Sequence, residues 1–99
     1  MVSQFDICRL GDGVLVVVLQ DDLLSHLTLR VVAPLLSMAR AGPPTRGLNP
    51  VIAVGETPCV LKPEFLSSVP LRNLGPAIGT ARTQRDEIVR ALDLLFTGI

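Results

Sequence analysis

The feature that most restricts the fold of this chain is an unbroken apolar run of six residues, Val14 to Leu19. Most of its side chains are branched at Cβ, which favours a strand. Because the run is apolar on both faces, we expect a central strand or one that a partner covers. The run is far shorter than a membrane span, so we expect no association with a membrane.

Other patterns predict further strands on both sides of this run. Phe5 to Leu10 alternates between apolar and polar residues and leads into a Gly-Asp-Gly turn. Leu27 to Leu36 is a second apolar stretch, in which Pro34 implies an edge, a bulge or a bend. Residues 50–61 predict a hairpin, and residues 69–74 predict a last short strand.

The C-terminal residues predict one helix. Thr83 is a candidate N-cap, and acidic residues in the first turn favour the positive end of the helix dipole. One continuous apolar face follows, made of Ile88, Ala91, Leu92, Leu95 and Phe96. The predicted fold class is therefore mainly β with one C-terminal helix, in a single domain over residues 1–99.

The end of this helix has two interpretations. In the first, Gly98 is left-handed and Ile99 packs on Leu94 in a Schellman motif, which explains why Leu94 does not fit the apolar face. In the second, the chain ends in an exposed helix tip whose apolar last residue is a docking surface. The two are compatible, because a cap would also fix the shape of the tip.

The composition argues against a nucleic-acid ligand and for a homodimer. The 99 residues carry nine basic and nine acidic side chains, whereas nucleic-acid binders usually have a basic excess. Aromatic residues, on which bases stack, make up only 3%. Apolar residues make up 48%, more than a lone domain of this size comfortably buries, and a homodimer would cover the excess.

No set of residues predicts catalysis, a cofactor or a metal site. His26 is a lone histidine in a loop, and the adjacent Asp21 and Asp22 would point to opposite faces of an extended chain. Cys8 and Cys59 have neither the spacing of a zinc or redox site nor the number needed for a disulfide framework. We expect them to be small buried side chains with reduced thiols, in a cytoplasmic protein without a secretory leader.

Five segments together resemble the CcdB toxin family in order and spacing. They are Val18–Leu24, Arg30–Leu35, Leu48–Glu56, Ser68–Pro70 and Glu87–Ile99, and the last of them ends on the same Gly-Ile as the family. The likeness covers nearly the whole chain. It implies a homodimer whose subunits combine a twisted antiparallel sheet in an SH3-like partial barrel, a smaller second sheet and a C-terminal helix.

The resemblance also implies a function that needs no catalysis. Family members bind the A subunit of DNA gyrase and trap its cleaved complex with DNA, and a CcdA-type antitoxin neutralises them. Their gyrase-contacting surface includes the end of the C-terminal helix and the loop after the second strand. Carried over by motif, the gyrase-binding residues expected here are Leu23, Leu24, Asp93, Thr97, Gly98 and Ile99.

One position departs from the family pattern. In the best-known form of the family, a tryptophan just before the terminal Gly-Ile stacks on an arginine of gyrase, and Thr97 occupies its place here. Loss of a large aromatic hot spot typically costs about 2 kcal/mol, which is roughly tenfold or more in affinity. We therefore expect weaker binding to gyrase, a variant surface or a loss of toxicity.

Two alternative functions stay open. An endoribonuclease of the MazF/Kid type shares the fold, and it needs an acid–base pair and a basic groove. Arg30, Arg40 and Arg46 are candidates for the groove, and Asp21 or His26 for the base, although the neutral charge and scarce aromatics argue against RNA. The other alternative is a remnant of the family that binds its antitoxin but has no target left.

Overall fold

The apolar run near the N-terminus forms the central strand of the structure, a computed structural model that describes residues 2–99. This strand, β2 (Leu15–Val18), pairs with β1 (Asp6–Arg9) on one side and with β3 (Leu29–Ser37) on the other. Both pairings are antiparallel, with Cys8 opposite Val16 and Val17 opposite Ala33. Val16 to Val18 are buried without exception, so β2 is covered on both faces within the subunit.

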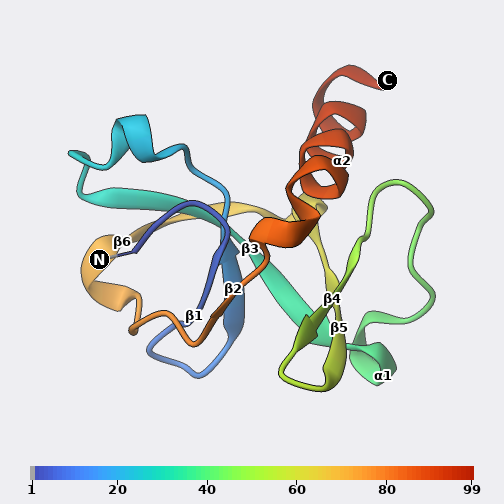
Figure 1. Ribbon diagram of the computed structural model, residues 1–99, viewed down its shortest axis with the longest axis horizontal. Helices are drawn as coiled ribbons and strands as arrows, with labels where there is room; N and C mark the ends of the chain where they lie inside the picture. The colour runs from blue at the N-terminus through green and yellow to red at the C-terminus, as the bar shows by residue number, and fades with distance from the viewer. Residues whose placement is uncertain (1) are drawn as a thin grey trace.

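The other strands extend this sheet on both sides (Figure 1). β4 (Val51–Val54) and β5 (Thr57–Leu61) form the expected hairpin, and β5 joins the second half of β3. β6 (Ser67–Pro70) pairs with the first half of β3, and β7 (Gly79–Thr80) pairs with β1.

The sheet of the described residues has the order β4-β5-β3-β2-β1-β7, with β6 added on β3. It curls into a nearly closed antiparallel barrel, and the helix α2 (Arg85–Thr97) follows it at the C-terminus. The fold class predicted from the sequence is thereby confirmed. The smaller second sheet corresponds to the hairpin β4–β5, which is continuous with the main sheet through β3.

Pro34 lies within the long strand β3, where one side of that strand changes its partner. β6 pairs with residues 29–32, and β5 pairs with residues 35–37. The carbonyl oxygen of Pro34 accepts a hydrogen bond from the Lys62 N–H on this side, at 3.0 Å. Since the N–H and C=O of one strand residue point to the same side, the N–H that proline lacks would face Lys62, which lies just beyond the end of β5.

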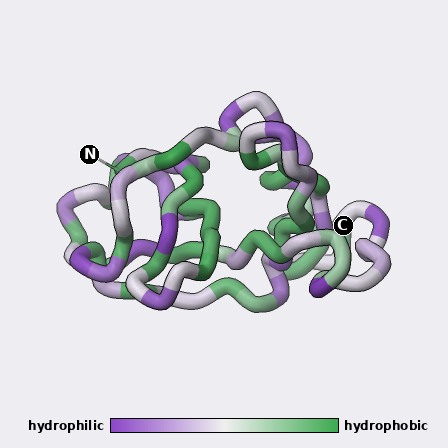
Figure 2. Tube along the Cα trace, turned by 90° about the horizontal axis from the view of Figure 1, so that it is seen from below, coloured by the Kyte–Doolittle hydropathy of each residue, from purple (hydrophilic) through white to green (hydrophobic). Residues whose placement is uncertain are grey.

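Two apolar clusters lie on the two faces of the sheet, because successive strand residues alternate between faces. The larger cluster includes Ile7 and Val17 from the sheet and Ile88 from α2. The smaller cluster consists of Cys8, Val16, Val18 and Val32. Figure 2 shows the apolar stretches running mainly along the strands, with the hydrophilic stretches concentrated in the loops around them.

The start of the C-terminal helix differs from the prediction. Thr83 is not an N-cap: it lies in a 3-10 turn, η4 (Arg82–Gln84), and α2 begins after it at Arg85. The side chain of Gln84 caps no helix N–H, and its Nε2 donates instead to the carbonyl oxygen of Val51 at 2.7 Å. The entry into α2 is therefore fixed by a tertiary contact to β4 rather than by a local cap.

Short helical turns occupy several connections, and sequence periodicity does not predict them. They are η1 (Asp22–Leu24), α1 (Met38–Ala41), η2 (Pro63–Phe65) and η3 (Leu71–Asn73). The last of them corrects the strand predicted over residues 69–74, since β6 starts at Ser67 and stops at Pro70 where η3 begins. None of the helices within residues 2–99 is long and apolar enough to cross a membrane.

Gly98 ends α2 in the left-handed conformation that was predicted, with φ of 76°. Its N–H donates to the carbonyl oxygen of Leu94 at 3.0 Å, which is the simple αL motif rather than the predicted Schellman motif. Ile99 does not pack on Leu94, since it is 88% exposed. Leu94 lies instead beside Gly47, and a Cβ atom added to Gly47 would lie 3.5 Å from the Leu94 Cδ2 atom.

Candidate functional site

The apolar face of α2 loses its cover toward the C-terminus. Ile88 and Ala91 are fully buried, Leu92 and Leu95 are half-buried, and Phe96 is 69% exposed. The reason is geometric, because the last turns of the helix project beyond the sheet (Figure 1). Phe96 therefore lies on the predicted apolar face but outside the core, and the helix exposes an aromatic side chain to solvent.

An apolar groove lies between the end of α2 and the turn η1. It has a volume of about 390 Å³, and Leu24 from η1 and Phe96 from α2 both line it. Its other lining residues are Leu19, Gln20, Asp21, Val31, Leu66 and Leu92. We call this feature the Leu24–Phe96 groove. It brings together two segments that are separated by most of the chain.

Polar contacts hold the turn η1 in place beside this groove. The carboxylate of Asp21 accepts a hydrogen bond from the Leu23 N–H at 2.8 Å, and that of Asp22 accepts one from the Gln4 N–H at 2.8 Å. Gln20 Nε2 donates to the carbonyl oxygen of Leu24 at 3.2 Å. Both aspartates therefore have structural partners, and Leu23 is held outward with 85% of its surface exposed.

The tip of α2 carries the other residues expected to bind gyrase. Asp93, Thr97, Gly98 and Ile99 are exposed, so the tip is not sealed inside the subunit. The Thr97 hydroxyl donates to the carbonyl oxygen of Asp93 at 2.7 Å and so stays within its own helix. Ile99 borders a second cavity of about 540 Å³, which is lined also by Arg46, Gly47, Glu87, Arg90 and Leu94.

Two of the expected site residues thus lie on the two flanks of one projecting helix. Leu24 lines the groove on one flank, and Ile99 borders the cavity on the other. Phe96 and Leu66, which line the groove, were not among the expected site residues. The sequence feature that could have indicated the exposure of Phe96 is its position in the last turn of a terminal helix, because such a turn can extend beyond the sheet on which the helix packs.

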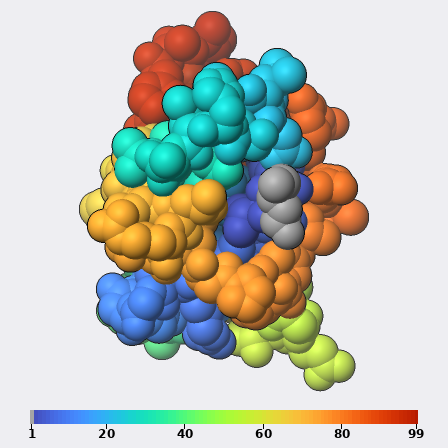
Figure 3. Space-filling model, turned by 90° about the vertical axis from the view of Figure 1, so that its left-hand side faces the viewer, coloured from blue at the N-terminus to red at the C-terminus, as the bar shows by residue number. Residues whose placement is uncertain are grey.

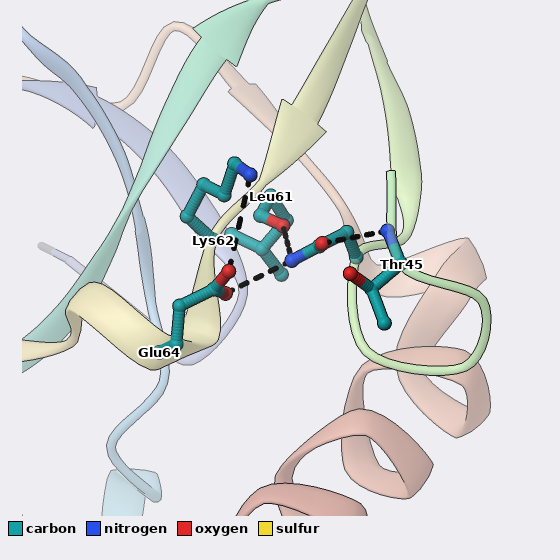
Figure 4. A network of polar contacts seen from close by, with 5 residues as sticks. Thr45, Leu61, Lys62 and Glu64 are labelled. Carbon is teal, nitrogen blue, oxygen red and sulfur yellow. Dashed lines mark hydrogen bonds and ion pairs between the residues drawn. The ribbon is translucent and has the colours of Figure 1, made fainter. Parts of the chain in front are cut away.

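A network of hydrogen bonds fixes the loop that faces the second flank (Figure 4). Asn49 is buried, and its Oδ1 accepts from the Thr45 N–H at 2.9 Å. Its Nδ2 donates to the carbonyl oxygen of Leu61 at 3.1 Å and to Glu64 Oε1 at 2.9 Å. Glu64 also pairs with Lys62, at 3.8 Å between Nζ and Oε2. These hydrogen bonds therefore hold the loop before β4 in place beside the helix tip.

The residues considered for catalysis are not assembled into one site. His26 is exposed, and Arg30, Arg40 and Arg46 line three different cavities. Cys8 and Cys59 are free and buried. Burial raises the pKa of the Cys8 thiol, and the nearby charge of Asp6 raises it further. Within residues 2–99, no three His, Cys, Asp or Glu side chains are grouped so that they could hold a metal ion.

Comparisons with known proteins give a family and a fold. The family model described as CcdB protein matches residues 4–98 of this chain. Among solved structures, an endoribonuclease from mycobacterial species is similar with a TM-score of 0.77 at 12% identity, over 93% of this chain and 88% of the other. An identity this low shows a shared fold alone. No curated protein sequence matches.

Proposed function

This chain belongs to the CcdB family and is the toxin of a toxin–antitoxin system, and from that premise we propose that its target is the A subunit of DNA gyrase. In this proposal it binds gyrase without chemistry of its own and traps the cleaved gyrase–DNA complex. It acts as a cytoplasmic homodimer and is neutralised by a CcdA-like antitoxin. The proposed contact residues are Leu23, Leu24, Asp93, Thr97, Gly98 and Ile99, with Phe96 added from the geometry.

The observation that carries the proposal is the exposed apolar side chains around the tip of α2. Leu23 is 85% exposed, Phe96 69% and Ile99 88%. Phe96 lines the Leu24–Phe96 groove, and Ile99 borders the cavity on the other side of the helix. Exposed apolar clusters of this kind mark surfaces that bind other proteins. Local structure supports two of them, since a capped turn holds Leu23 and a left-handed glycine directs Ile99.

The deciding experiment measures trapping of the gyrase cleavage complex. Purified protein is incubated with gyrase, supercoiled plasmid and ATP, and linear DNA is quantified after denaturation of the enzyme. We expect the full chain to accumulate linear DNA. Removal of Gly98 and Ile99, or the substitution Leu23→Asp, should abolish the signal and growth inhibition while leaving the fold intact.

A matched control comes from the opposite end of β3. Met38 is an exposed apolar residue of α1, 44% exposed and remote in the fold from the turn η1 that precedes β3. Met38→Asp should therefore trap gyrase as the unchanged chain does. Undiminished trapping by the truncated chain would refute the proposed contact surface.

Thr97 tests the role of the family tryptophan. Thr97→Trp restores a large aromatic side chain next to Gly98, and a hot spot of this kind is worth about 2 kcal/mol. We expect it to lower the concentration needed for half-maximal trapping by roughly thirtyfold. A chain that traps nothing, before and after this substitution, would favour the remnant of the family.

Endoribonuclease activity is the competing function, because the mycobacterial structure shares the fold. It is less well supported, since the candidate basic residues line separate cavities and Asp21 is engaged as a cap. Incubation of purified protein with a long RNA separates the two functions. Cleavage that vanishes in His26→Ala or Asp21→Asn would replace the gyrase proposal.

A further inference from the structure

Arg30 is a buried cation without an acidic partner. It lies in β3 and is only 4% exposed. Within residues 2–99 the ion pairs are Lys62 with Glu64 and Arg85 with Asp86, so none involves Arg30. Removing a charge from water is costly unless it is paired and hydrogen-bonded. Hydrogen bonds to backbone carbonyl oxygens offset this cost of desolvation only in part.

The guanidinium of Arg30 uses three of its five N–H donors in the protein. Nη1 donates to the carbonyl oxygens of Leu27 and Leu29, at 2.6 and 2.9 Å, and Nη2 donates to that of Ser25 at 2.9 Å. Nε has no partner in the described part of the chain. Every fully enclosed side-chain nitrogen in these residues has a hydrogen-bond partner. Since Nε has none, it keeps some contact with solvent.

Arg30 lines a cavity of about 560 Å³. Figure 3 shows the face of the molecule that carries the segment around residue 25 and the segment 71–77, which both contribute to the lining of this cavity. Its other lining residues are mostly apolar: Val2, Ser25, Leu71, Leu74, Gly75, Pro76 and Ala77. This volume is within the usual range for small-molecule sites, which combine an apolar wall with a few polar anchors.

We propose that this Arg30 cavity binds a small organic carboxylate. The remaining donors, on Nε and Nη2, would hold the carboxylate, since a guanidinium matches the planar geometry of that group. The aliphatic part of the ligand would lie against Leu71, Leu74 and Pro76. The ligand offsets the unpaired charge of Arg30. The lining of the cavity shares no residue with the surface proposed to bind gyrase, although Ser25 directly follows the turn η1.

The test is a titration of the ¹⁵N-labelled full-length protein with hexanoate, followed by NMR. We expect saturable shifts of the Arg30 Nε–H and of the backbone amide of Ala77. Acetate should bind about tenfold more weakly, because it lacks the aliphatic chain that the apolar wall covers. Hexanol, which keeps the chain but has no charge, should leave the Arg30 signal unchanged. As an independent measurement, hexanoate should raise the thermal unfolding midpoint and hexanol should not.

The variants avoid removing Arg30, whose hydrogen bonds support the loop at residues 25–29. Ala77→Glu places a negative charge at the exposed rim of the cavity and should weaken hexanoate binding by about tenfold or more. Ala39→Glu adds the same charge at an exposed position in α1 and should have no effect. The proposal is overturned if the Arg30 signal does not move, if hexanol shifts it equally, or if Ala77→Glu binds hexanoate unchanged.

Discussion

Gly98 determines the direction in which the chain leaves α2. Its φ of 76° is costly for any residue with a Cβ, and nothing else lies within 4 Å of that position. Gly98→Ala should therefore lower the free energy of unfolding by about 1 kcal/mol through backbone strain alone. Urea denaturation measures this. The control is Gly11→Ala, where φ is not left-handed and space is also open, so equal losses in the two variants would contradict the account.

Cys8 gives the molecule a pH dependence at the alkaline side. Burial, and then the charge of Asp6, raise the pKa of its thiol above the value of about 8.5 for an unfolded chain. Above that pH the unfolded chain releases the proton while the folded one retains it, so the free energy of unfolding falls as pH rises toward the folded pKa. Below about pH 8.5 the thiol is protonated in both states, and its contribution to the free energy of unfolding is fully present.

The comparison with Cys8→Ala isolates this effect, because all other titrating groups are common to both proteins. The difference in unfolding free energy between the two should be constant from pH 7 to 8 and shrink as the pH approaches about 10. Native Cys8 should also resist thiol reagents, since the thiolate is the reactive form. A pH-independent difference would show that folding does not shift this thiol.

Among the elements, α2 changes its role along its length. Ile88, fully buried in the larger cluster, stabilises the fold, whereas Phe96 is mostly exposed at the other end. Ile88→Ala should lower the free energy of unfolding by about 2–5 kcal/mol, and Phe96→Ala by less than about 1 kcal/mol. Phe96→Ala should instead weaken trapping of gyrase. A large loss of stability in Phe96→Ala would mean that its ring belongs to the core.

Local patterns predicted the elements that bury long apolar stretches. The run around β2, the hairpin β4–β5 and the apolar face of α2 have signals within a few residues. β7 has only two residues and is defined by its pairing with β1, which is remote in sequence. Thr83 misled the prediction of the helix start because a tertiary contact of Gln84, not a side-chain cap, fixes that start.

The helix tip was predicted as a docking surface from its residues, whereas the turn η1 was predicted only from the family resemblance. Neither pointed to the groove that joins them. Periodicity placed Phe96 on the apolar face of the helix, but it did not predict that the side chain would be mostly exposed. Periodicity gives the face of a helix, whereas the length of the sheet beneath decides how far that face is covered.

At the scale of the molecule, the subunit exposes more surface than its mass requires. Its accessible area is 5954 Å², against about 5,500 Å² expected for a compact monomer of this mass. The excess accompanies a projecting helix and exposed apolar side chains on several elements, among them Leu27, Leu29 and Phe65. The run Val14–Leu19 is no longer a candidate for a subunit interface, because β2 is covered within the chain.

A homodimer that covers part of this surface would tie folding to protein concentration. For two-state unfolding of a dimer to two unfolded chains, each tenfold rise in concentration adds about 1.4 kcal/mol to the apparent stability. We therefore expect the urea midpoint to rise across a hundredfold range of concentration, and sedimentation equilibrium to give twice the chain mass at the upper end. A midpoint that does not move, together with the mass of one chain, would mean that the exposed helix tip meets its target as a monomer.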